Sequence, residues 1–329
     1  MTRQQDMLNI KAPGLRRGDM IGVVAPAGPV DRARLERALA RFHAIGFRTR
    51  TYADVFRGGD YLASDDDTRA RELIAAFTDP ETTGVWCARG GYGVVRLLER
   101  IDFDALRQQP KVFVGFSDIS ALHAAIQNRV GLVTIHAPNL QDGFGAEAEM
   151  SPATASALWS AVLAEKQSAA GDGYAFDLSG PLAAELEPLA GGKARGRLTG
   201  GNLAVVCGTI GTPYEMDTAG RILFVEDVGE PLYRIDRFLA QLALAGKLRA
   251  AAGILTGSFS GDDEPAPGFD AAVRQLLRDY TAPLGIPVLA GFPAGHRREN
   301  LALPINALVE VDADARRVRV CENPVAARP

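Results

Sequence analysis

Cysteine, charge of one sign and long apolar runs are all scarce in this sequence. Only three cysteines, Cys87, Cys207 and Cys321, occur in 329 residues, and they lie far apart with no Cys-x-x-Cys or Cys/His ligand spacing. Disulfide bridges and a structural zinc site are therefore not expected, and a reducing compartment fits best. The formal net charge is −4, which gives no electrostatic reason to bind nucleic acid or an acidic membrane surface.

Membrane and export signals are also missing. No stretch of about 18 apolar residues occurs, and the first 20 residues contain no apolar signal-peptide core. We therefore expect a cytoplasmic protein with no membrane partner. Hydrophobic residues make up 47% of the chain and charged residues 23%, as in ordinary globular proteins. A length of 329 residues suits two domains better than one.

The first 140 residues alternate between short apolar runs and segments with helical periodicity. Expected strands lie in "MIGVV", "FRTRTYADV", "TGVWCARGG", "KVFVGFSD" and "LVTIHAPN", and expected helices lie between them. Strands that alternate with helices predict a parallel sheet with helices on both faces. We therefore expect an N-terminal α/β domain over residues 1–140.

The character of the chain changes after residue 140. Residues 141–180 are rich in Gly, Ala and Ser, with one expected helix at about 151–166, and we interpret them as the connection between two domains. Residues 181–329 contain several β-prone segments, interrupted by the helical stretch "PLYRIDRFLAQLALAG" and ending in an expected hairpin around "DAD". This second domain is predicted to be β-rich, either α+β or barrel-like.

The stretch "KVFVGFSDIS" places a serine, Ser117, where an apolar strand ends and a helix begins. Such a turn lifts the hydroxyl clear of the sheet and aims the first N–H groups of the helix at a developing oxyanion. Gly115 relieves crowding at the turn, but Ile119 stands where the second glycine of G-x-S-x-G would be. From these residues alone, Ser117 is either a nucleophile or a helix N-cap.

A nucleophilic serine needs a base, and the chain has four histidines. His43 lies near the end of a surface-type helix, and His123 lies within the helix after Ser117, so both are expected to be structural. His136 ends an expected strand and could line a crevice. His296 lies in the Gly/Pro-rich loop "GFPAGHRREN", where no apolar face explains it, and is either a surface residue or the base.

A carboxylate is needed to orient the base. The apolar run Ile222–Val225 brings Glu226 to the end of an expected buried strand, where a carboxylate must be paired or hydrogen-bonded. A protonated histidine would be a suitable partner. Asp227 and Glu230 follow closely and could instead cap the next helix.

The glycine loop "ARGGYG" also follows an expected strand. Gly90 and Gly91 let the backbone approach a ligand closely, so one of their N–H groups could serve as an oxyanion donor together with the N–H of Asp118. The alternative is a plain strand-to-helix turn. Neither G-x-G-x-x-G nor a phosphate-loop Lys-Ser/Thr pair is present, which argues against a nucleotide-dependent enzyme.

Together these stretches are similar to one family. "VVAPAGPV", "ARGGYGVVRLL", "VGFSDISALH", "LTGGNLAVVCGTIGTPYEMD", "ILFVEDVGEPLYRIDRFLAQL" and "GFPAGHRRENLALPINA" resemble the LD-carboxypeptidases, also called murein tetrapeptide carboxypeptidases. The matches occur in order from about Met20 to about Val309. One departure is Asn306 in "LPINA", where a glycine is expected, but Asn tolerates the same left-handed backbone.

The resemblance implies a serine peptidase with a Ser–His–Glu triad, without metal or cofactor. By position, Ser117 matches the nucleophile, Glu226 the orienting acid and His296 the base. It also implies a flavodoxin- or Rossmann-like N-terminal domain, a β-rich C-terminal domain, a site between them and usually a homodimer. The implied substrate is a murein peptide, cleaved in the cytoplasm between the L-centre of meso-diaminopimelate or lysine and a terminal D-alanine during cell-wall recycling.

A carboxypeptidase must also bind a free carboxylate, for which arginine is well suited. Arg89 is a candidate together with Tyr92 and Asn202, and further arginines near the motifs leave the choice open. These further arginines are Arg234, Arg297 and Arg298. Residues 141–180 match nothing specific in the family and could encode substrate choice.

Two other functions compete with the murein peptidase. Some family members resemble the microcin C self-immunity peptidase, which cleaves aminoacyl-nucleotide amides and needs an aromatic residue to stack on the base. Trp159 and Tyr174 lie in the unmatched segment, although Trp159 falls in an amphipathic helix and is expected to pack. A non-catalytic two-lobed binding protein would leave Glu226 and His296 unexplained.

Overall fold

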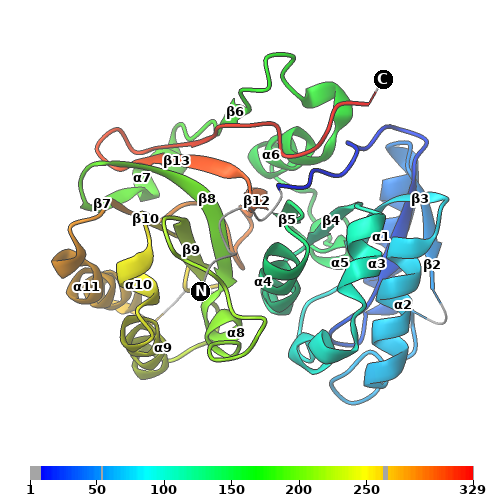
Figure 1. Ribbon diagram of the computed structural model, residues 1–329, viewed down its shortest axis with the longest axis horizontal. Helices are drawn as coiled ribbons and strands as arrows, with labels where there is room; N and C mark the ends of the chain where they lie inside the picture. Colours follow the sequence, from blue (N-terminus) through cyan, green and yellow to red (C-terminus); the bar gives the residue numbers. More distant parts are fainter. Residues whose placement is uncertain (1–8, 53–54, 262–265, 329) are drawn as a thin grey trace.

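The computed structural model describes residues 9–52, 55–261 and 266–328, which form two α/β halves side by side (Figure 1). The N-terminal half is drawn in blue and cyan at the right, and most of the C-terminal half lies at the left in green to orange. Residues 1–8, which belong to the stretch searched for a signal peptide, lie outside the described ranges.

The N-terminal half is built on a six-stranded sheet with the order β12-β5-β4-β3-β1-β2. Its strands are β1 (Met20–Val24), β2 (Arg48–Thr51), β3 (Thr82–Cys87), β4 (Val112–Gly115), β5 (Thr134–His136) and β12 (Leu303–Ile305). Its helices are α1 (Arg32–Ala44), α2 (Asp66–Thr78), η1 (Val94–Arg100), α3 (Phe103–Gln108), η2 (Ser117–Ile119), α4 (Ser120–Arg129) and α5 (Leu140–Gly143). The first five strands pair in parallel, as the alternating pattern predicts.

Helices cover both faces of this sheet. Successive side chains of a strand point to opposite faces, so Trp86 of β3 and Phe113 of β4 lie on different sides in the observed register. Phe42 of α1 meets Trp86 edge-on with ring centroids 5.0 Å apart, and Phe77 of α2 packs on Phe113 at 5.7 Å. Strands buried on both faces explain why these runs are apolar throughout rather than alternating.

The sixth strand, β12, comes from the far end of the chain. It pairs antiparallel with β5, so that Leu303 lies opposite His136. Asn306 follows directly with a φ of 72°, which confirms the left-handed backbone expected for this position. Its side-chain amide donates to the carbonyl of Gly131 at 2.9 Å. The chain therefore crosses from one half to the other at a turn that is hydrogen-bonded to the N-terminal half.

The C-terminal half contains an open mixed sheet of eight strands, in the order β6-β14-β13-β8-β9-β10-β11-β7. The strands are β6 (Tyr174–Ala175), β7 (Glu187–Ala190), β8 (Lys193–Asn202), β9 (Ile222–Glu226), β10 (Gly253–Thr256), β11 (Val288–Ala290), β13 (Leu308–Asp312) and β14 (Arg317–Val320). The helices are α7 (Pro181–Glu185), α8 (Leu203–Cys207), α9 (Leu232–Leu244), α10 (Lys247–Ala250), α11 (Phe269–Thr281) and η4 (Ala282–Leu284). The β13–β14 hairpin is the one expected around "DAD".

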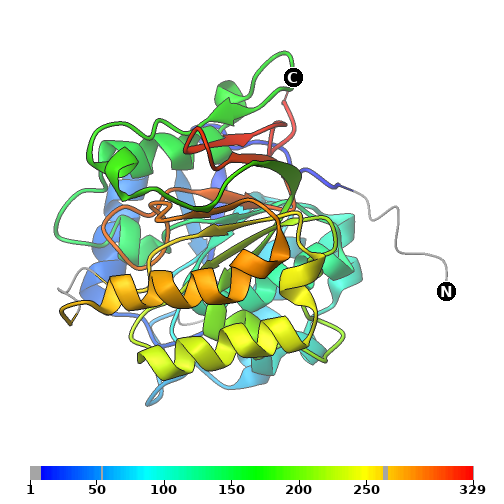
Figure 2. The ribbon, with the colours of Figure 1, turned by 90° about the vertical axis from the view of Figure 1, so that its left-hand side faces the viewer.

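The strand β9 has its two faces in two different cores. Leu223 and Val225 belong to the apolar cluster beneath α9 and α11, which run side by side across the sheet (Figure 2). Ile222 and Phe224 belong instead to the large cluster shared with the N-terminal half. With a period of two, the next residue on the inner face is Glu226. The strand thus directs this carboxylate toward the N-terminal half.

Residues 141–180 are spread over both halves. Helix α6 (Pro152–Val162) is capped by Ser151 and followed by η3 (Ala164–Lys166). Trp159 of this helix stacks on Phe47 of the N-terminal half, with ring centroids 5.9 Å apart. Further on, β6 is the edge strand beside β14 in the C-terminal sheet. The segment therefore contributes structure to each half.

Helix α4 is the principal contact between the halves. Its first eight residues are all buried, which explains why "SALHAAIQ" has no polar face. The Gln127 amide donates to the carbonyl of Leu198 and accepts from the Thr199 hydroxyl, and the Ser120 hydroxyl accepts from the N–H of Asn202. The helix that begins just after Ser117 is thus bonded directly to β8 of the other half.

Candidate active site

Ser117 stands at the carboxyl end of β4 in a strained turn. Its φ is +66°, a left-handed value that non-glycine residues rarely adopt. A side chain at Gly115 would have no room, because its Cβ would lie 2.9 Å from Ile119 Cγ2. The turn therefore has the geometry of a nucleophile elbow although the second glycine of the G-x-S-x-G pattern is absent.

His296 joins Ser117 to Glu226. The Nε2 atom of His296 lies 2.9 Å from Ser117 Oγ, and its Nδ1 lies 2.8 Å from Glu226 Oε2. With Nδ1–H donating to the carboxylate, Nε2 is left as the acceptor for the serine hydroxyl. This chain of hydrogen bonds crosses from β4 of one half to β9 of the other.

The Glu226 carboxylate is completely buried, with 0% of the residue exposed. Its second oxygen, Oε1, has no donor among the described residues, so its one hydrogen bond is the one from His296. Burial lowers the pKa of His296, but the charge and hydrogen bond of Glu226 outweigh it, so the pKa is raised above 6.5. The acid therefore stabilises the imidazolium form of the base.

The loop that carries His296 is held from two sides. Gly295 has a φ of +127°, and a Cβ there would lie 2.8 Å from both Glu226 Oε2 and Ser258 Oγ, so the position requires glycine. Its N–H donates to the side chain of Asn300, whose own N–H donates to Thr154 Oγ1 of α6. The imidazole is thus fixed by packing and by a hydrogen-bonded loop.

The other three histidines are not part of this arrangement. His43 lies on the surface and contacts the Thr49 hydroxyl at 2.7 Å. His123 is buried and contacts Thr134 Oγ1 and the Gly115 carbonyl, as a packing residue does. His136 is completely buried between aromatic rings, and neither of its ring nitrogens has a partner among the described residues.

Three candidate oxyanion donors come from the glycine loop and from the residue after Ser117. They belong to Gly90, Gly91 and Asp118, and none has a hydrogen-bond acceptor in the described part of the chain. A Cβ on Gly90 would lie 2.9 Å from Ser117 Cβ and 3.1 Å from its Oγ, so the glycine loop lies directly against the serine. Free donors at this position can stabilise an oxyanion.

The hydroxyl of Ser117 opens into a cleft of about 750 Å³. The residues that line it are Arg34, Arg89, Gly90, Gly91, Phe116, Ser117, Pro138, Asp142, Gly143, Ala146, Ala148, Glu149, Met150, Thr154, Gly295, His296, Arg297, Arg298 and Asn300. A cleft of this size suits a short peptide or a comparable small molecule.

The three substrate-binding candidates lie in different surroundings. Arg89 lines the cleft, and its guanidinium donates to the carbonyl of Pro29. Tyr92 is 51% exposed outside the cleft lining, 6.0 Å from the ring of Tyr61. Asn202 is buried, and its amide donates to Asp227 and accepts from the N–H of Val205. Of the further arginines, Arg234 pairs with Glu230, whereas Arg297 and Arg298 line the cleft.

Sequence reasoning did not single out the charged residues that face the cleft from the other side. Arg34, Asp142 and Glu149 all line it, and Arg34 lies 3.7 Å from the Asp142 carboxylate. Burial raises the pKa of Asp142. The available signal was the unmatched segment 141–180, since seven of its residues line the cleft.

The two aromatic residues considered for stacking on a nucleotide base, Trp159 and Tyr174, do not line the cleft. Trp159 packs against Phe47 and Phe144, and Tyr174 packs edge-on against Phe176 with its hydroxyl buried. Among the described residues that line the cleft, Phe116 is the only aromatic one besides the base, and it is 6% exposed.

The described residues offer neither a metal cluster nor a membrane-spanning helix. No group of three or more His, Cys, Asp or Glu side chains is arranged to hold a metal ion. In the same ranges, no helix combines the length and apolar character needed to cross a bilayer.

Comparison with known proteins identifies both halves. Residues 21–137 match the LD-carboxypeptidase N-terminal domain, and residues 195–311 match the LD-carboxypeptidase C-terminal domain. The chain is 41% identical to a probable murein peptide carboxypeptidase of Bacillus subtilis over 300 residues, which cover 91% of each protein.

Solved structures share the fold. A muramoyltetrapeptide carboxypeptidase from Oxalobacter formigenes superposes with a TM-score of 0.75 at 28% identity, covering 91% of this chain and 97% of that one. The microcin C7 self immunity protein MccF superposes with a TM-score of 0.85 at 23% identity, covering 96% of this chain and 100% of that one. At that identity the likeness to MccF establishes the fold alone.

Proposed function

The chain belongs to the LD-carboxypeptidase family, and we propose that it removes the terminal D-alanine from murein tetrapeptides. The bond cleaved would join the L-centre of meso-diaminopimelate or lysine to D-alanine. Ser117 would be the nucleophile, His296 the general base and Glu226 the acid that orients it.

One observation carries this proposal. The contacts of Glu226, His296 and Ser117, at 2.8 and 2.9 Å, form an unbroken chain that ends in an open cleft. A helix cap needs no histidine at its hydroxyl, and a binding protein needs no buried acid behind that histidine. Serine acyl transfer accounts for all three residues.

The first half of the reaction would form an acyl-enzyme. His296 Nε2 takes the proton of the Ser117 hydroxyl as Oγ attacks the carbonyl carbon before the D-alanine. The tetrahedral intermediate collapses when the C–N bond breaks, and His296 gives its proton to the departing amine of D-alanine. Glu226 stays ionised and stabilises the imidazolium that forms between these two transfers.

The second half would release the tripeptide. His296 Nε2 takes a proton from water, and the hydroxide attacks the ester carbonyl. The second intermediate collapses when the bond to Ser117 Oγ breaks, and His296 returns the proton to the serine. In both intermediates, the unpaired N–H groups of Asp118 and of Gly90 or Gly91 would hold the oxyanion.

The charges of the cleft support a zwitterionic substrate. Arg89, Arg297 and Arg298 can receive carboxylates, of which a tetrapeptide has several, including that of D-alanine. Asp142 and Glu149 can receive the ammonium group of diaminopimelate or lysine. A peptide with both kinds of charge satisfies this lining better than an apolar ligand does.

Hydrolysis of aminoacyl-nucleotides remains the competing activity within the family. It would require a face on which adenine can stack. Neither Trp159 nor Tyr174 lines the cleft, and Phe116 beneath it is almost fully buried. These positions favour the murein peptide as the substrate.

The cellular setting is part of the same proposal. A cytoplasmic enzyme of this specificity would recycle cell-wall peptides, working without a metal or cofactor, as a homodimer. Sedimentation velocity of the purified protein would test the dimer, with a molecular mass of about twice 35.0 kDa expected. A species of single-chain mass across the micromolar range would contradict it.

A panel of three substrates tests the activity. The wild type is incubated with L-Ala-γ-D-Glu-meso-diaminopimelate-D-Ala, with the matching peptide ending in L-Ala, and with an aspartyl sulfamoyl adenosine, and products are measured by mass spectrometry. Release of one alanine from the D-Ala peptide alone is expected. Cleavage of the adenosine compound in preference to the peptide would establish the competing activity instead.

A further inference from the structure

The side chain of Asp118 lies away from the cleft and bonds to the far end of the glycine loop. Asp118 is 3% exposed, and its Oδ2 accepts the backbone N–H of Val94 at 2.8 Å. Val94 is the first residue of η1, directly after the loop formed by Ala88–Gly93. The residue after the proposed nucleophile therefore bonds to the segment that supplies the other oxyanion donors.

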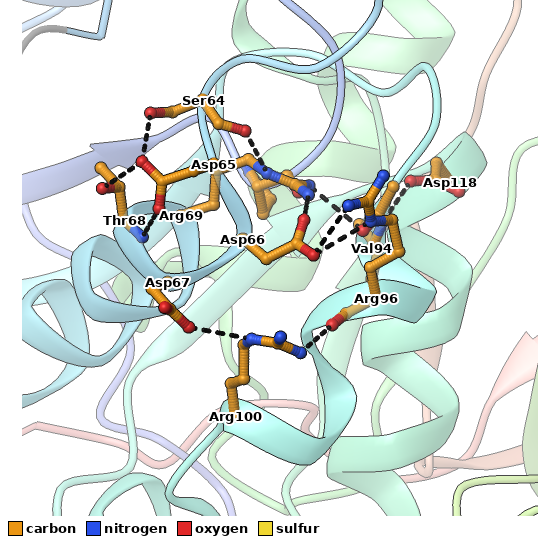
Figure 3. A network of polar contacts seen from close by, with 12 residues as sticks. Ser64, Asp65, Asp66, Asp67, Thr68, Arg69, Val94, Arg96, Arg100 and Asp118 are labelled. Atoms are coloured by element: carbon orange, nitrogen blue, oxygen red, sulfur yellow. Dashed lines mark hydrogen bonds and ion pairs between the residues drawn. The ribbon is translucent and has the colours of Figure 1, made fainter.

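Arg69 holds the same end of the loop from α2 (Figure 3). It is 1% exposed, and its guanidinium donates to the carbonyls of Gly93 and Pro26 and to the Asp66 carboxylate. Gly93 has a φ of +117°, and a Cβ there would lie 2.8 Å from Arg69 Nη1. The close approach of arginine and loop thus depends on this glycine.

The near end of the loop is fixed by the turn after β1. The N–H of Gly28 donates to the carbonyl of Gly90 at 3.0 Å. A Cβ on Gly28 would lie 3.1 Å from that same oxygen. Since Arg69 also bonds to Pro26, the turn after β1, the glycine loop and α2 form one connected unit.

We propose that Asp118 and Arg69 are positioning residues, which hold the Ala88–Gly93 loop so that its free N–H groups stay at the oxyanion position above Ser117. Asp118 then acts in two ways. Its backbone N–H is one oxyanion donor, and its side chain sets the distance to the loop that provides the other. This inference rests on the proposed acyl-transfer function of the site.

The consequence is specific to the transition state. A loose loop would weaken hydrogen bonds that form fully only when the carbonyl oxygen becomes negative. Substrate binding in the ground state, which uses the charges of the cleft, would change little. A change that acts on the loop should therefore lower kcat and leave KM nearly constant.

The test compares Asp118→Ala with Asp67→Asn. Asp67 belongs to the same polar network, but it pairs with Arg100 on the exposed side and does not touch the loop. For Asp118→Ala we expect kcat to fall about 100-fold with KM within about 3-fold of the wild type, as when an oxyanion donor is lost. Asp67→Asn should leave both constants unchanged.

A boronate distinguishes positioning from general damage. The probe is a peptide in which boron replaces the scissile carbonyl carbon, so that it becomes tetrahedral on Ser117. Its affinity should fall by about the same factor as kcat in Asp118→Ala, while Asp118→Asn, which keeps an acceptor oxygen, should recover part of both. Unchanged kcat and boronate affinity, or a change confined to KM, would overturn the proposal.

Hydrogen exchange gives a readout that needs no substrate. Amides of residues 88–94 should exchange faster in Asp118→Asn and Asp118→Ala than in Asp67→Asn, with the rest of the N-terminal half unchanged. Equal protection of the loop in Asp118→Asn and Asp67→Asn would contradict the positioning role, and this comparison holds even if Asp118→Ala fails to fold. Failure of the wild type to cleave any substrate, with the loop effect present, would instead count against the proposed function.

Discussion

The two strand ends that meet at His296 have similar sequences of residues but differ in the hydrogen bonds that hold them. β4 delivers Ser117 and β9 delivers Glu226, and each is followed at once by a buried aspartate, Asp118 or Asp227. Burial raises the pKa of both aspartates to about 6. In each case the aspartate fastens a neighbouring segment to the strand end.

The two aspartates differ in the number of hydrogen bonds that they accept. Among the residues that the structure describes, Asp118 accepts one N–H, from Val94. Asp227 accepts three donors, which are the Asn202 amide and the backbone N–H groups of Ala204 and Val228. The turn at Ser117 is left-handed, whereas Glu226 is still part of a regular strand. The nucleophile thus lies in a strained turn whose following aspartate accepts one hydrogen bond, whereas the acid is followed by an aspartate that accepts three.

This difference indicates where mutations should act. Loss of Asp118 at the β4 end should lower mainly kcat, because its hydrogen bond with Val94 holds a small loop beside the reacting atoms. Loss of Asp227 at the β9 end should appear mainly in stability, because one buried and two partly buried donors lose their acceptor at once.

The largest effect should come from the residue that both ends share. In His296→Gln the serine loses its base and the acid loses its partner, so kcat should fall at least about 10⁴-fold. The midpoint of urea unfolding should fall as well, because the buried Glu226 carboxylate loses its hydrogen bond from His296. Residual activity within 100-fold of the wild type, measured by D-alanine release, would show that the two ends do not meet in a working triad.

Glu226→Gln tests whether the acid at the end of β9 sets the tautomer and the pKa of His296. A glutamine amide favours the wrong tautomer of His296, so kcat should fall on the order of 10³–10⁴-fold. Because Glu226 raises the pKa of His296, the ascending limb of kcat/KM should lie above pH 6.5 in the wild type and move to lower pH in the variant. A limb at the same pH in both proteins would exclude this coupling.

The two aspartates can be compared directly by stability at pH 7. Asp227→Ala leaves one buried and two partly buried donors without their acceptor and should lower the free energy of unfolding by about 3 kcal/mol, against about 1 kcal/mol for Asp118→Ala. Urea denaturation of both variants and the wild type measures the difference. A larger loss of unfolding free energy in Asp118→Ala than in Asp227→Ala would contradict the expected difference between one hydrogen bond and three.

The contribution of Asp118 to stability should also depend on pH. The pKa of Asp118 is raised to about 6 in the folded protein, so between about pH 4 and 6 the folded state binds a proton that the unfolded state has released. Its contribution to stability is therefore full below about pH 4 and is lost as the pH rises through 6. Relative to the wild type, Asp118→Asn should gain on the order of 2 kcal/mol from pH 4 to pH 7. A constant difference across this range would contradict the shift.

Local patterns were sufficient for the framework of the fold. The apolar runs and the helical periodicity between them predicted the strands and helices of the N-terminal half, and the comparisons confirm the family and the two-domain α/β architecture. The run before Glu226 predicted a buried strand end, and the carboxylate is completely buried there. These features depend on a few neighbouring residues, which a sequence displays directly.

Long-range pairings were beyond such patterns. β12 has only three residues, one of them a proline, and nothing local indicates that it pairs with β5 some 170 positions earlier. Arg69 resembles any other charged residue of an amphipathic helix, yet it is buried beneath the glycine loop. The bond between Asp118 and Val94 likewise depends on how two segments pack, not on either sequence alone.

Some residues that line the cleft could not be predicted from the sequence either. Asp142 and Glu149 lie in a segment without recognisable motifs. Asp142 is held in α5 beside Arg34, whereas Glu149 lies in the loop before α6, which packs against the N-terminal half. The motif residues were found because the chemistry of acyl transfer demands particular side chains. The residues that choose the substrate follow no such rule.

The most direct test of the account is the release of D-alanine from L-Ala-γ-D-Glu-meso-diaminopimelate-D-Ala by the wild type and by Ser117→Ala. The two proteins are compared at equal concentration by mass spectrometry, after urea melts have shown that both are folded. We expect loss of a single alanine residue with the wild type and none with Ser117→Ala. Release by both proteins would show that Ser117 is not the nucleophile and that the proposed triad is wrong.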